Sequence, residues 1–245
     1  MKFKEEEITS ISQLIERLNE HIGAYQGPIW FRGQSNSAWK LEPRLMRINP
    51  VPSESNFLNR FKQNASMILP NRPNSEFEWL FLMQHYGIPT RLLDWSESPL
   101  VALYFALNEL KDESAALWVL MPVELNKLSR YRPVYEYEIP SFEDKHLELY
   151  LPSTIAAETR SSLLPMAAIA PRNSARMLSQ QGVFTISHRD EASLESILDA
   201  KDINYIWRYI IPSSAIEPLN KELKLLGYSK FQLFPELESL SENFK

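Results

Sequence analysis

The sequence predicts an α+β fold with mixed or antiparallel sheets and flanking helices. Patterns typical of helices and strands alternate irregularly, and some gaps between strand patterns are of hairpin length, which disfavours a doubly wound sheet. The 245 residues, 44% hydrophobic and 23% charged, are enough to bury a sizeable core. No repeat or linker-like change of composition divides the chain. We therefore expect a single domain over residues 1–245, with an N-terminal helical part (1–27) and a core (28–240).

The spacing of apolar residues predicts each element in turn. Apolar side chains at i, i+3, i+4 and i+7 indicate helices, and short apolar runs indicate buried strands. In the first half, the patterns predict a helix over 11–22, a strand over 28–32, loops over 35–53 and 90–96, and helices over 57–68 and 74–87. In the second half, they predict a core helix over 100–110, strands over 115–121, 166–170 and 183–187, a half-exposed strand over 203–211 and a last helix over 213–226. Residues 133–139 are weakly strand-like, and 141–163 are polar and partly helical at most.

Local signals mark the ends of these helices. Serine and asparagine side chains accept hydrogen bonds from the first free N–H groups of a helix, and proline is favoured at its first position. The predicted helix starts are Ser10, Asn74 or Ser75, and Ser98 followed by Pro99. Glycine often follows the last residue of a helix because it tolerates a left-handed backbone. Gly23, Gly87 and Gly227 fit that position.

The composition excludes several classes of site. The chain has no cysteine, so disulfides, thiolate nucleophiles, iron–sulfur clusters and cysteine-based zinc sites are ruled out. Its formal net charge of -5 makes nucleic acid an unfavoured partner. Neither a long apolar segment nor a signal peptide is recognisable, so we expect no contact with a membrane and a cytoplasmic location. The glycine motifs of dinucleotide-binding and P-loop folds are also absent.

Several segments of unusual composition resemble the FRG domain family. They are Phe31-Arg32-Gly33-Gln34 followed by Trp39, Leu41, Pro43 and Arg47; Gln84 to Ser96 continuing from Ser98 to Ala106; Arg176, Gln180, Gly182 and Phe184; and Phe231 to Leu237. The resemblance spans roughly residues 30–240. It implies a site built from the first two segments, but the activities of the family are mostly unassigned, and fold alone does not define function.

The first motif places a cation beside a glycine at the end of a predicted strand. The guanidinium of Arg32 offers a rigid fork of donors that suits a diphosphate or a carboxylate. The structural alternative is an ion pair with an acid such as Asp94. Gly33 would let a ligand approach the backbone, and Gln34 completes the expected binding segment.

The second motif combines several side chains that suit a binding site. His85 could act as an acid, a base or a hydrogen-bond donor, or it could only cap a helix. Tyr86 and Trp95 could stack on a ring, although Trp95 could equally fill the core. Arg91 could bind an anion or pair with Asp94. No other histidine is spaced to form a metal site with His85, so no metal is expected.

The chain also has a remoter similarity to ADP-ribosyltransferases of the Arg-Ser-Glu type. That similarity implies that Arg32 grips a dinucleotide and that Ser96 orients the nicotinamide ribose. The third element of that family supplies a glutamate, whereas this chain has Gln180 and Gln181 there, with Gln181 as the catalytic candidate. Glutamine can hydrogen-bond a ribose hydroxyl but carries no charge to stabilise an oxocarbenium-like state. Glu97 is a second candidate carboxylate.

Three hypotheses about function follow. The first is an enzyme that uses NAD as substrate, either an ADP-ribosyltransferase with a macromolecular target or an NAD glycohydrolase, which would suit a bacterial toxin or antiphage system. The second is a non-catalytic module that binds a phosphate-containing ligand or a protein. The third is an RNA-acting protein whose basic surface would include Arg44, Arg47 and Arg60.

Overall fold

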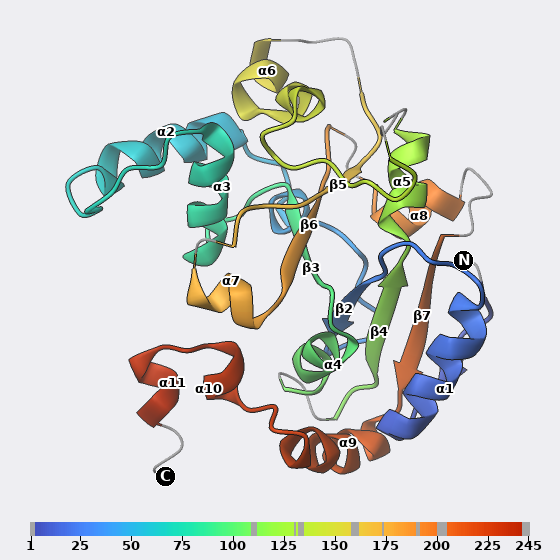
Figure 1. Cartoon of the computed structure of the whole chain (residues 1–245). Coiled ribbons are helices and arrows are strands. Elements are labelled where there is room, and N and C mark those ends of the chain that lie inside the picture. The colour runs from blue at the N-terminus through green and yellow to red at the C-terminus, as the bar shows by residue number, and fades with distance from the viewer. Residues whose placement is uncertain are drawn as a thin grey trace.

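The computed structural model contains one seven-stranded mixed sheet with helices against both faces (Figure 1). It describes residues 3–108, 112–129, 131, 135–157, 162–172, 174–189, 192–199 and 205–241. The strands are β1 (Glu6–Glu7), β2 (Trp30–Gln34), β3 (Leu92–Ser96), β4 (Ala115–Leu120), β5 (Met166–Ala168), β6 (Gly182–Ile186) and β7 (Ile206–Ile211). Their order is β1-β7-β4-β2-β3-β6-β5, and only β1 and β7 pair in parallel. The predicted α+β class is confirmed.

The helices of the described residues are α1 (Ile11–Ile22), α2 (Glu54–Ala65), α3 (Glu76–His85), α4 (Pro99–Leu107), α5 (Pro122–Leu128), α6 (Pro152–Ala157), α7 (Ala175–Ser179), α8 (Leu194–Asp199), α9 (Ser213–Leu225), α10 (Lys230–Leu233) and α11 (Leu237–Ser241), with 3-10 turns over Arg44–Arg47 and Lys145–Tyr150. The five helices that the sequence predicts, α1, α2, α3, α4 and α9, begin within three residues of their predicted starts. The side chains of Ser10, Ser75 and Ser98 each accept a backbone N–H three residues on, which confirms these helix starts.

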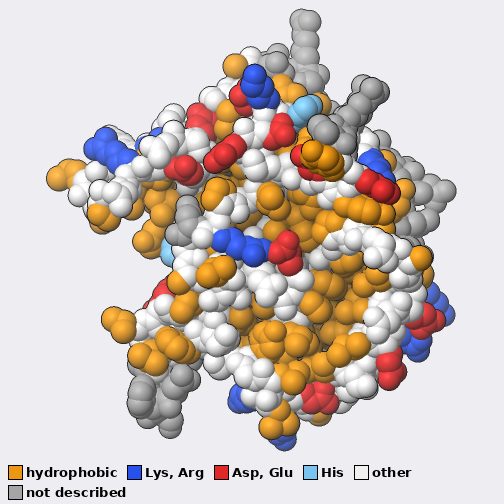
Figure 2. Space-filling model, in the orientation of Figure 1, with side chains coloured by type: hydrophobic (Ala, Val, Ile, Leu, Met, Phe, Trp, Pro, Cys, Tyr) orange, Lys and Arg blue, Asp and Glu red, His pale blue; other side chains and the backbone are white. Residues whose placement is uncertain are grey.

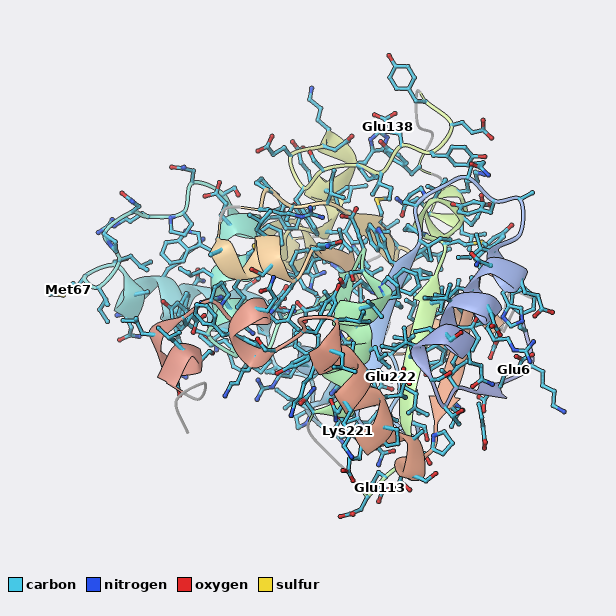
Figure 3. The ribbon with its side chains drawn as sticks, turned by 60° about the horizontal axis from the view of Figure 1, so that its bottom comes forward. Glu6, Met67, Glu113, Glu138, Lys221 and Glu222 are labelled. Atoms are coloured by element: carbon cyan, nitrogen blue, oxygen red, sulfur yellow. The ribbon has the colours of Figure 1, made fainter. Side chains whose placement is uncertain are left out.

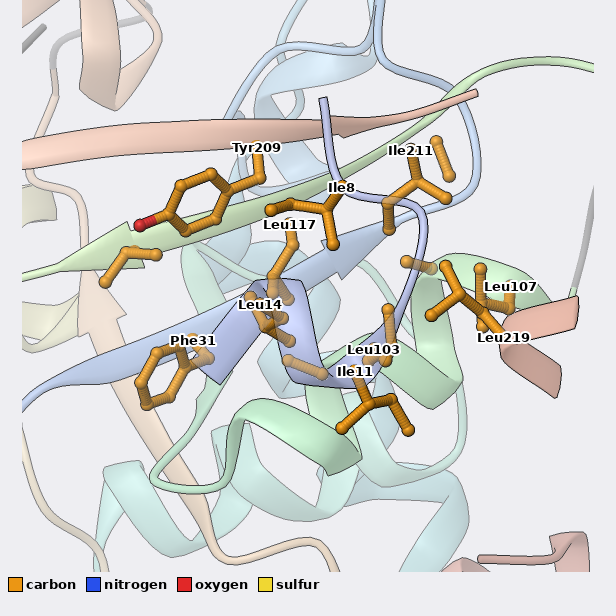
Figure 4. Close-up of a cluster of buried hydrophobic side chains, with 14 of the residues drawn as sticks. Ile8, Ile11, Leu14, Phe31, Leu103, Leu107, Leu117, Tyr209, Ile211 and Leu219 are labelled. Atoms are coloured by element: carbon orange, nitrogen blue, oxygen red, sulfur yellow. The ribbon is translucent and has the colours of Figure 1, made fainter. Parts of the chain in front are cut away.

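One half of the sheet is covered by α1, α4 and α9. Ile11 and Leu14 of α1, Leu103 of α4 and Leu219 of α9 meet Leu117 of β4 in one buried cluster (Figure 4). Each such side chain contributes roughly 1.5–3 kcal/mol by leaving water. A hydrogen bond joins two of the helices, because Glu222 of α9 (Figure 3) accepts the backbone N–H of Ile11 at 2.7 Å.

The other half of the same face is covered by α2, α3 and the segment around the second 3-10 turn. Leu58 of α2 and Leu80 of α3 belong to a separate buried cluster with Leu92 and Phe184 of the sheet. The opposite face carries a third cluster, in which α5 and α8 pack against tryptophans and aliphatic residues of β2, β3 and β4. The two clusters on the first face meet at the boundary between β2 and β3, which is where the candidate site lies.

Two strand predictions were wrong in part. Residues 92–96, predicted as loop, form the interior strand β3, because they pair with β6 along their whole length. The half-exposed strand predicted at β7 is confirmed, because Trp207, Tyr209 and Ile211 are buried while Arg208 and Ile210 between them are partly exposed. Residues 135–139 form no strand, and 133–134 lie outside the described residues. The short elements β1, α5, α7, α8, α10 and α11 were missed because they carry too few residues for a period to be recognised.

The surface seen in Figure 2 mixes both signs of charge. Lys and Arg side chains lie among Asp and Glu side chains on this face, and hydrophobic side chains gather over the region of α4, β4 and β7. In the part of the chain that the structure describes, no helix is long and apolar enough to span a membrane.

Candidate functional site

The sheet opens between β2 and β3. These strands register at a single pair, Phe31 with Ser96. In contrast, β2 pairs with β4 and β3 pairs with β6 through all five of their residues. Beyond the single pair, the guanidinium of Arg32 provides a bond across the opening, because its Nη1 donates to the backbone carbonyl of Asp94 at 2.6 Å. The opening therefore lies between two halves of the sheet. Within each half, the strand beside the opening pairs with its other neighbour along its whole length.

A cavity of about 840 Å³ occupies this opening. Residues of β2, β3, α3, α4, α7 and the loop between α2 and α3 line it. Its volume lies within the range of cofactor and small-molecule sites, roughly 300–1,000 Å³. The charged side chains in its lining are Arg32, Arg47, Arg72, Arg176, Glu78 and Asp94. Four guanidinium groups against two carboxylates favour an anionic ligand.

The loop between α2 and α3 forms the outer wall of the cavity. Leu69, Asn71 and Arg72 of this loop line the cavity, whereas Met67 projects away from the molecule and is 96% exposed (Figure 3). Arg72 is exposed, so its charge stays hydrated.

Arg32 is one of two cavity arginines that are partly buried, the other being Arg176, whereas Arg47 and Arg72 are exposed. The Arg32 side chain is 19% exposed, and its Nη1 lies 4.0 Å from the carboxylate Oδ2 of Asp94. The predicted contact with Asp94 is thus mainly a hydrogen bond to the backbone, with a weaker ionic contact to the side chain. The guanidinium also lines the cavity, so its charge faces any anion that binds there.

Gly33 and Gln34 also line the cavity, but each has a structural role. Gly33 allows close packing of a helix, and the Gln34 side chain forms hydrogen bonds within the protein. A Cβ on Gly33 would lie 1.9 Å from the carbonyl oxygen of Ala102, so the glycine is needed because α4 crosses β2 closely. The close crossing of α4 accounts for this glycine, and the approach of a ligand to its backbone stays a prediction. Gln34 accepts a hydrogen bond from Trp118 at 2.7 Å and donates to the carbonyl of Lys40 at 3.1 Å, so both ends of its amide are engaged.

Ser96 connects β3 to the start of β6. Its hydroxyl donates to the carbonyl of Gln180 at 2.7 Å and accepts the N–H of Ser98 at 3.0 Å. A serine has one hydrogen to donate, so Ser96 holds Gln180 in place and has only acceptor capacity left. The amide of Gln180 lines the cavity and donates to the carbonyl of Leu233 at 3.1 Å.

Gln181, the sequence-based catalytic candidate, lies outside the cavity lining. It is exposed and adopts a φ of 47°, a left-handed conformation, immediately before β6. Its carbonyl accepts the N–H of Glu97 at 3.1 Å. The sharp turn at this residue directs Gln180 rather than Gln181 toward the cavity. Glu97 also lies outside the lining and forms an ion pair with Arg172.

His85 and Tyr86 lie at the end of α3 and on the cavity wall. Their rings are perpendicular, with centroids 5.0 Å apart, and Tyr86 is 65% exposed. Partial burial lowers the pKa of His85, the nearby Arg176 guanidinium lowers it further, and Glu236 opposes both. His85 is therefore neutral at pH 7, with one ring nitrogen as donor and the other as acceptor.

Arg91 and Trp95 are parts of the core. Arg91 is 5% exposed and pairs with Glu54, with its Nε 2.6 Å from Oε2, and it also donates to the carbonyls of Tyr150 and Ser187. It lies outside the cavity lining, so the expectation that it binds a ligand or pairs with Asp94 is not met. Trp95 touches the cavity but is 3% exposed, and its Nε1 donates to Thr185 at 3.0 Å.

Comparison with known families identifies part of the chain. Residues 27–115 match the FRG domain. This match supports the FRG family, and it contains Arg32, His85, Tyr86 and Ser96 but ends before Gln180. No curated protein and no solved structure matches the chain. The similarity to ADP-ribosyltransferases therefore stays a hypothesis.

Sequence reasoning passed over three side chains that the cavity contains. Asp94 and Gln84 lie within the FRG match and line the cavity. Their place in the second motif could have marked them as site residues, but the sequence analysis assigned neither of them a contact with a ligand. Arg176 lies beyond the match, and its guanidinium stacks over Phe234 at 4.7 Å. Among the described residues, no group of three or more His, Asp or Glu side chains could hold a metal ion.

Proposed function

We propose that the cavity binds NAD as a substrate and that the protein is an NAD-using enzyme, either an ADP-ribosyltransferase or an NAD glycohydrolase. The observation that carries this proposal is the Arg32 guanidinium at the opening of the sheet, inside a large cavity with an excess of cationic side chains. A guanidinium fork binds pairs of phosphate or carboxylate oxygens, and a diphosphate offers several such pairs. Consumption of cytoplasmic NAD would suit a toxin or an antiphage system.

The aromatic side chains of the cavity favour a ligand with rings. Tyr86 is 65% exposed and Trp39 is 40% exposed, and both belong to the lining. Exposed aromatic faces of this kind stack on flat rings such as adenine and nicotinamide. Neutral His85 supplies one donor and one acceptor for an amide or a hydroxyl.

The reaction would break the bond between C1′ of the ribose and the nicotinamide nitrogen. The nitrogen keeps the electron pair, so nicotinamide leaves as a neutral molecule. An oxygen of water, or a nucleophile of a macromolecular target, forms the new bond to C1′ and loses its proton to solvent. In this cavity, Gln180 would hydrogen-bond a ribose hydroxyl, Ser96 would position Gln180, and Arg32 would hold the diphosphate.

Incubation of the purified protein with NAD, followed by chromatography for free nicotinamide, tests the proposal. We expect nicotinamide release that is lost in Arg32→Ala and kept in Arg60→Ala, which removes an exposed arginine outside this cavity. Label that stays on a macromolecule would indicate transfer, and free ADP-ribose would indicate hydrolysis. Neither binding nor release of NAD at millimolar concentration, or full release by a folded Arg32→Ala protein, would refute the proposal.

A non-catalytic binding module is the second candidate. Gln180 takes the place of a catalytic carboxylate, and its amide already donates to the carbonyl of Leu233. An uncharged group there gives little stabilisation to an oxocarbenium-like transition state. This candidate predicts that NAD, or another phosphate-containing ligand, is retained intact in the same assay.

A further inference from the structure

We infer that Asp94 recognises a sugar hydroxyl beside the anion held by Arg32, so that the cavity takes ribose-bearing diphosphates in preference to bare phosphates. The inference rests on the proposed function and deepens it, because it names the feature of the ligand that the site selects. It depends on three observations about Asp94: its place in β3, the groups that hold it, and its distance from Arg32.

Asp94 occupies an unusual place for a carboxylate. It stands in the middle of the interior strand β3, between Leu93 and Trp95, which are both 3% exposed. Its own side chain is 59% exposed and lines the cavity. Aspartate is depleted in strands, so its position here contributes little to the sheet itself.

A chain of hydrogen bonds fixes the orientation of this carboxylate. Gln84 donates from Nε2 to Oδ2 of Asp94 at 2.8 Å. The Oε1 of Gln84 accepts the hydroxyl of Thr90, and Thr90 is fully buried and accepts the N–H of Leu92 at 3.2 Å. Thr90 thereby fixes which end of the Gln84 amide faces Asp94. Among the described residues, Oδ1 of Asp94 accepts no hydrogen bond from the protein, so it is available to a ligand.

The other carboxylate of the cavity has a structural task. Oε2 of Glu78 accepts the backbone N–H of Asn74 at 2.6 Å, at the start of α3. This is the pattern of an N-terminal capping interaction. The role of Glu78 at the start of α3 is therefore explained without any contact to a ligand. Asp94 differs in that, among the described residues, its carboxylate accepts from the side chain of Gln84 and not from the backbone of its own element.

The chemistry of the Asp94 and Arg32 pair defines a class of ligand. An ionised carboxylate only accepts hydrogen bonds, and a hydroxyl is a favourable donor to it, whereas a phosphate is repelled. The carboxylate Oδ2 lies 4.0 Å from Nη1 of Arg32, so a ligand that satisfies both must carry an anionic oxygen and a hydroxyl a few ångströms apart. A ribose joined to a diphosphate has these two groups, and inorganic pyrophosphate has only the anion.

Calorimetric titration with ADP-ribose and with inorganic pyrophosphate tests this inference on the full chain. The unmodified protein should bind ADP-ribose more tightly than pyrophosphate. Asp94→Asn and Asp94→Ala should weaken ADP-ribose binding by roughly 10- to 100-fold, the range for a hydrogen bond to a charged group. Pyrophosphate binding should stay unchanged or become tighter, since a repulsive charge is removed. Glu143→Gln, which removes an exposed carboxylate outside the cavity, should change neither affinity.

The outcomes separate this inference from the proposed function. Equal losses of ADP-ribose and pyrophosphate binding in both Asp94 variants, or no loss in either, would overturn the role of Asp94 and leave NAD binding intact. An Asp94-dependent preference for ADP-ribose in a protein that neither binds nor cleaves NAD would support the role and refute the proposed function. Failure of the unmodified protein to prefer ADP-ribose would overturn the inference directly. Thermal melting of each variant verifies its fold, and Asp94→Asn keeps an oxygen that can still accept from Gln84.

Discussion

Replacement of Glu54 by glutamine tests whether Arg91 is a structural residue. The two side chains are 5% and 6% exposed and form an ion pair of 2.6 Å. The carboxylate also accepts the backbone N–H of Arg91 at 2.8 Å. Glutamine has nearly the same shape, but it lacks the charge and presents an NH₂ group where one of these two bonds needs an acceptor.

The expected loss of stability follows from these contacts. One charge-assisted hydrogen bond, worth roughly 1.5–3 kcal/mol, is removed. The guanidinium of Arg91 then stays buried without a counter-charge, and breaking one partner of a buried pair costs about 3–5 kcal/mol in all. We therefore expect Glu54→Gln to lower the free energy of unfolding by about 3–5 kcal/mol, a large part of the stability of an ordinary domain.

Urea unfolding with linear extrapolation measures this change, and Glu143→Gln serves as the control for loss of one exposed carboxylate. The control should change stability by less than about 0.5 kcal/mol. The double variant Arg91→Met with Glu54→Leu should be less destabilised than either single variant, because no charge is left unpaired. A loss below about 1 kcal/mol in Glu54→Gln would refute the structural role. NAD affinity of the folded Glu54→Gln protein should not change, since Arg91 lies outside the cavity.

Four further predictions concern the site and the elements around it. Arg32→Lys should weaken NAD binding by about tenfold or more in calorimetry, since a point charge replaces a rigid fork of donors. Gly33→Ala should lower the free energy of unfolding by about 3 kcal/mol in urea titrations, because the new methyl group would meet the backbone of Ala102. His85 has a lowered pKa and is neutral at pH 7, so a bound anion should draw a proton onto it and NAD affinity should rise from pH 7.5 to 5.5; His85→Ala should flatten that rise. Ser98→Ala should cost about 1 kcal/mol in thermal or urea unfolding, through the lost cap of α4.

Helix starts and the class of the fold could be predicted because they depend on neighbours in the sequence. A serine at positions 10, 75 and 98 bonds an N–H only three residues away, and that geometry needs no other part of the chain. The apolar run over 115–121 likewise fits a strand buried on both faces, and β4 is fully buried. β3 was missed because its sequence mixes charge, hydroxyl and aromatic groups, and only its pairing with β6 makes it a strand.

Sequence by itself determined that Arg32 and Arg91 belong to unusual motifs, but it could not determine which of them faces a ligand. Arg32 lies within β2 and Arg91 directly precedes β3, and their roles differ because residues far along the chain surround them differently. Glu54 and the carbonyls of Tyr150 and Ser187 enclose Arg91, whereas the parting of β2 from β3 leaves Arg32 at a cavity. Burial and counter-charge arise only when the chain folds, so the tertiary structure alone decided between a core ion pair and a binding site.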